Sequence, residues 1–303
     1  MWGGVLDRAG VREPETREGY TVQARAVRRF APAEYMAARL LLPAQLQPDL
    51  IVLVAFMHET DDQIDRGSRA EREAALHRWG LLVSDALASG TSSDPLLRTL
   101  AWTVRRHPAL RSRINAFLDG AAREVAWEQF SSEAEVGQYI KEYSLPALML
   151  SMGLLAPQGE PEAAEFERAC LALITAWQRL DFLEDLPGDV REGRVGISHQ
   201  LLARHGLTVH DLHPELADTE PFGQLVVSEV DAAVVLLKAA WPIATLAAGP
   251  HRPFLRAVLR VQELRAAAVR KAGVSLLSSP SGPSKVRSVA ALLLELGRRR
   301  LIR

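Results

Sequence analysis

The sequence predicts an all-α protein. Long segments rich in alanine, leucine and arginine place apolar residues three and four positions apart, which is the period of an amphipathic helix. No segment shows the sustained alternation of apolar and polar residues that is typical of a half-buried strand. The breaks between helical segments are short and evenly distributed, so we expect one helical domain over residues 21–303.

Turn and cap residues set the order of the elements. Residues 1–20 are polar and contain several glycines and a proline, which predicts a loose N-terminal arm. Pro43 and Pro48 delimit the connection between the first two helices, and Ser93-Asp94-Pro95 gives a later helix its cap and its first-turn proline. Further breaks fall at Pro157-Gln158-Gly159, Gly249-Pro250 and Ser278–Pro283. The predicted helices span residues 33–42, 48–65, 69–88, 94–106, 109–130, 133–154, 161–186, 223–248, 252–273 and 284–301.

Composition narrows the class of protein. The 303 residues are 48% hydrophobic and carry a formal net charge of -1, so no global basic field favours a nucleic-acid partner. The single cysteine, Cys170, excludes an intrachain disulfide. The charged N-terminus is not a secretory signal, and the apolar run Ile51–Met57 is much shorter than the roughly 20 residues that span a bilayer. We expect a cytoplasmic protein with at most peripheral membrane contact. The basic tail Arg298-Arg299-Arg300 could touch an anionic membrane, but a solvated basic helix end is the preferred interpretation.

Two groups of aspartates follow strongly apolar stretches of predicted helix. In the first group, Asp61 and Asp65 lie four residues apart, soon after the apolar run Ile51–Met57. Residues four apart share one face of a helix, so the two carboxylates lie one turn from each other. The second group repeats this spacing much later in the chain: Asp181, Asp185 and Asp189.

Such rows of like charge indicate a metal site. Repulsion at this spacing destabilises a helix by about 0.2–0.5 kcal/mol per pair in water, and by more where burial lowers the dielectric constant. A cation offsets this repulsion, and Mg²⁺ suits the rows because it binds few carboxylates, keeps waters and completes its octahedron with phosphate oxygens. One Asp-Asp-x-x-Asp string is also common at a solvated helix end, so the prediction rests on the pair of rows. Metals between them would neutralise a diphosphate as it leaves.

The residues around both rows resemble the squalene/phytoene synthase family of isoprenoid enzymes. The stretch from Gln178 to Arg194 is similar to the family's second aspartate-rich motif, roughly Q-x-x-N/D-x-x-x-D-x-x-x-D followed by G-R. The stretch from Phe56 to Asp65 is similar to the first motif, F-x-x-x-x-D-D-x-x-D. Weaker matches keep the family's order and spacing: Arg39–Pro43, Gly120–Glu124, Tyr139–Pro146 and Leu207–Leu212.

The resemblance implies an isoprenoid synthase fold, in which a single helical bundle surrounds a central active-site cavity. It also implies Mg²⁺ as cofactor and an allylic prenyl diphosphate as substrate. Carried over residue by residue, it makes five aspartates metal ligands: Asp61, Asp65, Asp181, Asp185 and Asp189. The first four are also predicted to be catalytic through the metals. The residues predicted to bind substrate are His58, Gln178, Arg194 and Tyr139. Bland alternatives stay open for three of them: a core histidine at His58, an ion pair with an acid at Arg194, and an ordinary core ring at Tyr139.

Several positions depart from the family pattern. His58 stands where relatives commonly carry a diphosphate-binding arginine, and Pro187 interrupts the second motif, which predicts that Asp189 sits on a turn. Gly196-Ile197-Ser198 replaces the usual Y-L-P, and the small-residue motif that lets two prenyl chains lie side by side is altered at residues 143–148. The ionising residues are kept, whereas the surroundings of a second diphosphate are changed. We therefore expect transfer of a short prenyl group to an aromatic acceptor, such as an indole or carbazole ring, in secondary metabolism.

Other functions fit parts of the same pattern. Head-to-head condensation of two prenyl diphosphates, as in presqualene or phytoene synthesis, is the alternative within the family. A class I terpene cyclase fits less well, because its second motif is N/D-D-x-x-S/T-x-x-x-E. A non-catalytic homologue is the alternative from another class, and retention of all five aspartates argues against it. A di-iron bundle would need Glu-x-x-His pairs, which we do not find on suitable helices. The sequence leaves the oligomeric state open.

Overall fold

The protein is helical throughout the part of the chain that the structure describes. The computed structural model describes residues 1–215, 219–279, 281–282 and 285–301, and no strand occurs among them, which confirms the predicted all-α class. The α-helices are α1 (Trp2–Arg8), α2 (Pro14–Phe30), α3 (Pro32–Leu41), α4 (Gln47–Ile64), α5 (Arg69–Ser89), α6 (Pro95–Arg106), α7 (Leu110–Ala126), α8 (Glu133–Tyr139), α9 (Leu145–Met152), α10 (Glu162–Glu184), α11 (Leu186–Glu192), α12 (His199–Arg204), α13 (Thr219–Ala240), α14 (Ile243–Leu246), α15 (Arg252–Ala272) and α16 (Lys285–Leu301).

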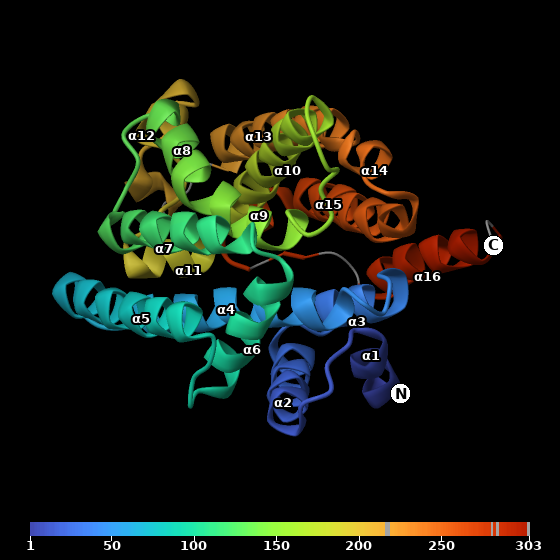
Figure 1. Ribbon diagram of the computed structural model, residues 1–303. Coiled ribbons are helices and arrows are strands. Elements are labelled where there is room, and N and C mark those ends of the chain that lie inside the picture. Colours follow the sequence, from blue (N-terminus) through green and yellow to red (C-terminus); the bar gives the residue numbers. More distant parts are fainter. Residues whose placement is uncertain (216–218, 280, 283–284, 302–303) are drawn as a thin grey trace.

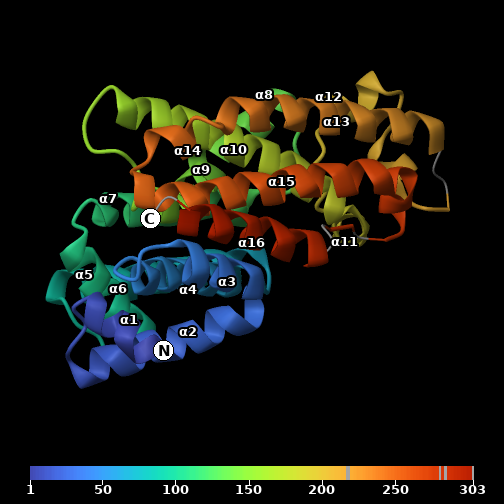
Figure 2. The same cartoon turned by 90° about the vertical axis from the view of Figure 1, so that its right-hand side faces the viewer.

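The helices form two groups. Figure 1 shows α1 to α6 below α7 to α15, and Figure 2 shows the same division from the side. The last helix, α16, returns to pack against α3 and α15 between the two groups (Figure 2). The two large hydrophobic clusters each take residues from both groups: Leu41 and Leu50 pack with the later helices, and Ile114 and Phe117 pack with the earlier ones. Tyr143 packs against both clusters. The two groups therefore meet around this tyrosine.

Helix boundaries follow the caps that the sequence contains. Ser68 and Glu71 form a reciprocal capping box that begins α5, and Gly90, with a left-handed φ of 76°, ends it. Asp94 accepts hydrogen bonds from the first backbone amides of α6, and Pro95 occupies the first turn, where it has no hydrogen bond to lose. These helices lie within a residue or two of their predicted positions.

The prediction of a loose arm over residues 1–20 is wrong. These residues form α1 and the first part of α2, and Leu6, Val11 and Tyr20 are each at most 2% exposed. The buried side chains pack in the same core as α4, which is why the segment is ordered despite its glycines. A boundary at residue 21 would fall inside α2.

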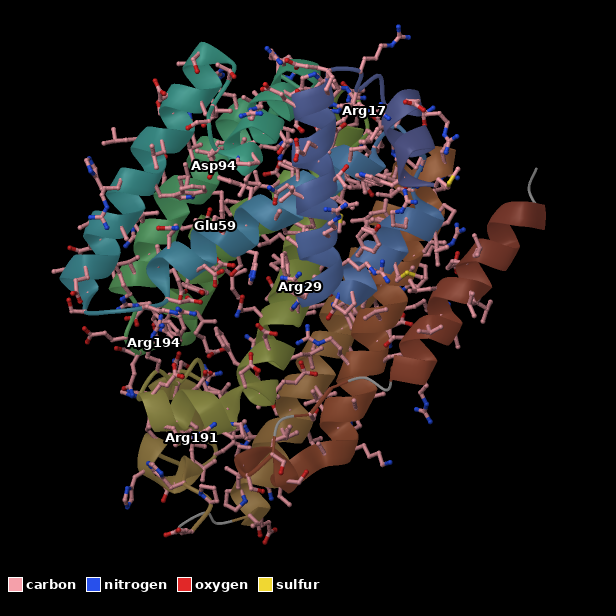
Figure 3. The ribbon with its side chains drawn as sticks, turned by 90° about the horizontal axis from the view of Figure 1, so that it is seen from below. Arg17, Arg29, Glu59, Asp94, Arg191 and Arg194 are labelled. Atoms are coloured by element: carbon pink, nitrogen blue, oxygen red, sulfur yellow. The ribbon has the colours of Figure 1, made fainter. Side chains whose placement is uncertain are left out.

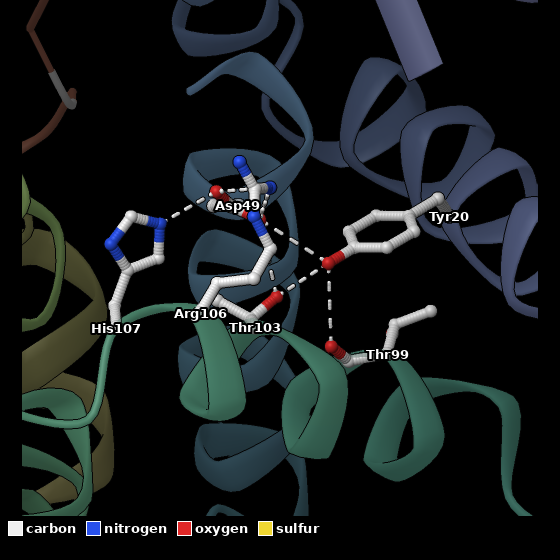
Figure 4. Close-up of polar contacts among 6 residues, drawn as sticks. All are labelled: Tyr20, Asp49, Thr99, Thr103, Arg106 and His107. Carbon is white, nitrogen blue, oxygen red and sulfur yellow. Dashed lines mark hydrogen bonds and ion pairs between the residues drawn. The ribbon is translucent and has the colours of Figure 1, made fainter. Parts of the chain in front are cut away.

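A buried carboxylate joins α2, α4 and α6. Asp49, in the first turn of α4, is fully buried and accepts two hydrogen bonds from Arg106 Nη1, at 2.9 and 3.0 Å (Figure 4). His107 Nε2 lies 2.9 Å from Asp49 Oδ2, and Tyr20 donates a longer hydrogen bond of 3.3 Å. Thr103 bonds Tyr20 at 2.6 Å and completes the network. This network anchors the N-terminal end of α4, whose C-terminal end carries Asp61.

The helix predicted over residues 133–154 is interrupted by a π-helical turn, η1 (Ile140–Ser144), between α8 and α9. At this turn α7 crosses very closely, since a Cβ atom on Gly120 would lie 2.1 Å from the carbonyl oxygen of Glu142. Only glycine fits there. From this turn Tyr143 reaches the end of α4, where its hydroxyl bonds Asp61. π-Turns of this kind occur frequently at functional sites.

Among the described residues, none of the helices combines the length and the apolar character that a bilayer crossing requires. The basic tail that was expected to make any membrane contact, Arg298-Arg299-Arg300, has side chains outside the described part of the chain.

Candidate active site

The first aspartate row lies where α4 emerges from the core. Asp61 is on the last turn of α4 and half-buried, and Asp65 follows the last residue of the helix and is exposed. Tyr143 donates a 2.8 Å hydrogen bond from its hydroxyl to Asp61 Oδ1, across from η1. This bond holds the Asp61 side chain in one orientation and leaves its second oxygen for a ligand.

The second row spans two helices. Asp181 is near the end of α10, Asp185 lies between α10 and α11, and Asp189 is within α11. The expectation that Asp189 sits on a turn is wrong, because Pro187 does not end a helix but occupies the first turn of α11. A proline is favourable in that position, since its missing amide would have no helical partner.

Arg265 of α15 contacts the second row and was not predicted. Its Nη2 donates to Asp181 Oδ1 at 2.7 Å and also to Glu184 Oε2, and its Nε donates to Glu184 Oε2 at 2.9 Å. Its guanidinium lies 5.6 Å from the ring centroid of Trp177. Asp181 therefore has a positive partner from the protein itself. Nothing in the sequence pattern distinguished this arginine from the others on α15.

A chain of polar contacts joins the predicted substrate-binding residues Tyr139 and Arg194. Tyr139 donates from its hydroxyl to Glu124 Oε2 at 2.5 Å, and Arg194 Nη2 donates to Glu124 Oε1 at 2.7 Å. The Arg194 guanidinium also lies 4.7 Å from the ring centroid of Trp127. Figure 3 shows Arg194 between α11 and the helices of the N-terminal group. Glu124 therefore links Tyr139 and Arg194 through one hydrogen bond to each.

The two rows approach the same guanidinium. The positive charge of Arg194 lowers the pKa of Asp65 in the first row and of Asp189 in the second. In both carboxyl groups this effect is outweighed by burial and by neighbouring acids, of which Glu124 acts on Asp65 and Asp185 acts on Asp189. Arg194 is thus a positively charged neighbour of an aspartate in each row.

The remaining predicted residues lie around these rows. Gln178, one turn before Asp181, accepts a 2.9 Å hydrogen bond from the Ser144 hydroxyl. His58, one turn before Asp61, stacks on Phe30 with ring centroids 3.7 Å apart and lies 3.7 Å from Asp62. Its side chain is 43% exposed, so it is not enclosed with the rows.

A continuous series of aromatic rings connects the two rows. Tyr143, which bonds Asp61, contacts the Tyr139 ring at a tilt of 56°, and Tyr139 contacts both Trp127 and Phe130. These two rings in turn contact Phe182, the residue after Asp181. Gly196 makes room for this arrangement, because a Cβ atom there would lie 2.0 Å from the Phe182 ring. The glycine that departs from the family's Y-L-P thus fits the phenylalanine packed against it.

The donor set fits Mg²⁺ as a cofactor that is bound together with substrate. Within the described ranges, no three histidine, cysteine, aspartate or glutamate side chains are grouped so that they hold a metal ion on their own. Mg²⁺ is usually bound through one or two carboxylates and substrate phosphate oxygens, which is what each row can offer. Burial and mutual repulsion raise the pKa of Asp61 to about 6 and that of Asp189 to about 7, and a cation would relieve this repulsion.

These raised values predict that the metal-free protein becomes less stable as pH rises. The folded state of Asp61 holds its proton up to pH of about 6, whereas the unfolded state loses it near pH 4, so stability falls between these values. Asp61→Asn has no carboxyl group to titrate at this position, so its stability should not fall in this pH range. At pH 8 its free energy of unfolding should exceed that of the wild type by about 1–2 kcal/mol, a figure reduced to allow for screening by solvent. Urea denaturation in EDTA at pH 4 and pH 8 measures the effect. A difference that is the same at both pH values would contradict it.

Two hollows in the described structure lie away from the aspartate rows. The larger, of about 690 Å³, is bordered by α15 and by residues near the start of α16, including Lys271, Ser275 and Arg287. The smaller, of about 300 Å³, lies between α13 and α15. The central cavity between the rows therefore stays a prediction.

Comparisons with known proteins agree with the motifs. Residues 31–288 match the model of the squalene/phytoene synthase family. A bifunctional protein CrtB/UppS from Streptomyces coelicolor is 36% identical over 67% of this chain, and the phytoene synthase of Rhodobacter capsulatus is 27% identical over 62% of it. The matches cover 35% and 53% of these two relatives' own lengths.

Solved structures agree on the fold. The crystal structure of a dehydrosqualene synthase superposes with a TM-score of 0.80 at 19% identity, covering 94% of this chain and 98% of the other. The squalene synthase HpnC from Alicyclobacillus acidocaldarius gives a TM-score of 0.76 at 22% identity, covering 88% and 98%. The isoprenoid synthase fold expected from the sequence is thereby confirmed.

Proposed function

The chain belongs to the squalene/phytoene synthase family, and on this premise we propose that it is an Mg²⁺-dependent prenyltransferase. In the proposed reaction the C–O bond of an allylic prenyl diphosphate breaks, and pyrophosphate leaves with the bonding electrons. The allylic cation is then captured by a small-molecule acceptor. The observation that carries the proposal is the family match over residues 31–288, which includes both aspartate rows. It is supported by the positive charge of Arg194, which acts on Asp65 of one row and on Asp189 of the other.

Different side chains have different roles in the proposed reaction. Bound Mg²⁺ would supply positive charge to the diphosphate as it leaves. The five aspartates of the two rows, Asp181 included, would hold the metals. Arg194, oriented by Glu124, would donate hydrogen bonds to phosphate oxygens, for which its planar fork is suited. Tyr143 keeps Asp61 oriented through its hydrogen bond.

The aromatic series has a separate role. Ring faces stabilise a nearby cation through their quadrupole, and buried rings keep water from capturing it. Tyr139 and Phe182 are each 9% exposed, and they stand between the two rows in the series of ring contacts. We assign these rings to protection of the allylic cation.

For the acceptor, an aromatic ring of the indole or carbazole type with a short prenyl donor is our first candidate. It is supported by Gly196 packed on Phe182 and by His58, which is partly exposed and stacked on Phe30, at two positions where the family pattern has other residues. Head-to-head condensation of two prenyl diphosphates is the second candidate. It is favoured by the relatives that are named phytoene synthases.

One pair of incubations separates the candidates. The protein with Mg²⁺ and farnesyl or geranylgeranyl diphosphate alone should release pyrophosphate and form a C30 or C40 product only if it condenses two donors. That product keeps one diphosphate if the reaction stops at the presqualene type and is a hydrocarbon if the second diphosphate also leaves. Dimethylallyl diphosphate with an indole or carbazole should give a prenylated ring under the first candidate. EDTA should abolish either reaction. No Mg²⁺-dependent pyrophosphate release with any donor would indicate a non-catalytic homologue.

A further inference from the structure

Arg265 is shared unequally between two carboxylates. Its guanidinium donates one hydrogen bond to Asp181, at 2.7 Å, and two to Glu184. The Glu184 side chain is 8% exposed and that of Asp181 is 39% exposed, while Arg265 itself is 11% exposed. The cation is therefore anchored in the protein by its buried partner, and Asp181 is its outer partner.

The Arg265–Glu184 contact costs more free energy to break than the Arg265–Asp181 contact. Glu184 has one buried oxygen, Oε1, without a hydrogen-bond partner, so removal of Arg265 from its other oxygen would leave a buried charge uncompensated. Asp181 is partly in water, and the guanidinium keeps two hydrogen bonds to Glu184 when Asp181 turns away. Asp181 is thus the side chain that can be released.

We propose that Arg265 is a positioning residue that competes with the divalent cation for Asp181. Without metal, Arg265 holds Asp181; when the cation binds, Asp181 turns to the metal and Glu184 retains the guanidinium. Arg265 thereby sets the metal affinity of the second row. This inference rests on the proposed function, because it requires that the row binds a divalent cation.

Substitutions of Arg265 and of Glu184 should change the Mn²⁺ affinity in opposite directions. Arg265→Ala removes the competitor, so Mn²⁺ should bind about tenfold more tightly than to the wild type. Glu184→Gln removes the charge that anchors the guanidinium, so Arg265 should hold Asp181 more firmly and Mn²⁺ should bind several-fold more weakly. Arg265→Lys keeps the charge without the forked geometry and should fall between Arg265→Ala and the wild type.

The experiment uses Mn²⁺ alone as the probe, with the full-length protein and without substrate. Electron paramagnetic resonance measures free Mn²⁺ during the titration, and thermal melting checks that each variant is folded. Arg260→Ala serves as the matched control, since Arg260 lies on the same helix and pairs with Glu263 rather than with the row. Its Mn²⁺ affinity should equal that of the wild type.

The possible results distinguish a failure of this inference from a failure of the proposed function. If the wild type binds Mn²⁺ and releases pyrophosphate, but Arg265→Ala and Glu184→Gln both weaken Mn²⁺ binding or leave it unchanged, Arg265 is a structural ion-pair partner and the inference is wrong. If the wild type neither binds Mn²⁺ nor releases pyrophosphate, the proposed function fails and the inference fails with it.

Discussion

Asp61→Asn and Asp185→Asn are each expected to slow Mg²⁺-dependent pyrophosphate release from an allylic prenyl diphosphate by about 10²- to 10³-fold. Loss of one preorganised electrostatic contact to a leaving group typically has an effect of this size. Asn keeps the shape of the side chain and can still accept the Tyr143 hydrogen bond at position 61. The double variant should be little slower than the slower single variant, because both rows act on the same diphosphate.

The control for these two variants is the same substitution at an aspartate outside the two rows. Asp231 on α13 is 63% exposed and pairs with Arg270, so Asp231→Asn should react at the wild-type rate. Single-turnover release of pyrophosphate at saturating Mg²⁺ gives the rates, and circular dichroism confirms the folding of each variant. Rates for Asp61→Asn and Asp185→Asn within threefold of the wild type would remove the rows from the reaction.

Asp49→Ala is expected to lower the free energy of unfolding by about 3 kcal/mol. The substitution leaves Arg106 and the hydroxyl network of Tyr20 and Thr103 without their central acceptor in a site where Asp49 is fully buried. Breaking a buried ion pair from one side usually costs about 3–5 kcal/mol, and Arg106, which is 26% exposed, recovers part of this by reaching water.

Urea denaturation of the wild type and the variant measures this loss. Asp7→Ala is the matched control, because Asp7 also pairs with an arginine, Arg17 at 2.7 Å, but is 66% exposed. Its effect should stay within about 1 kcal/mol. Equal effects of the two substitutions would mean that the Asp49 network adds no more stability than a surface ion pair.

Local signals were sufficient for much of the fold. The caps at Ser68 and Asp94 and the apolar periodicity of α4 and α10 act within one or two turns of chain, so the sequence alone located these helices. Segments with weak local signals were missed. α1 and α2 are ordered by Leu6 and Tyr20, which gain their stability from burial against distant helices.

The same distinction applies to the candidate site. The spacing of Asp61 with Asp65, and of Asp181 with Asp185, is a property of the chain and could be read directly. Arg265 could not, because its contact with Asp181 arises from the packing of α15 against α10. Pro187 was misread for the opposite reason. The sequence predicted that it interrupts a helix, but a new helix, α11, begins one residue before it, and a proline is favourable in that first turn.

By itself the sequence determined that this protein is helical, which two helices carry rows of acids, and which family the rows resemble, because periodicity, capping and motif spacing are written into neighbouring residues. Only the tertiary structure decided which partners those acids have. Tyr143 reaches Asp61 because α7 can cross η1 at Gly120, and Arg265 reaches Asp181 because two helices far apart in the chain pack together. Contacts of this kind depend on the close packing of the whole chain, which no local pattern specifies.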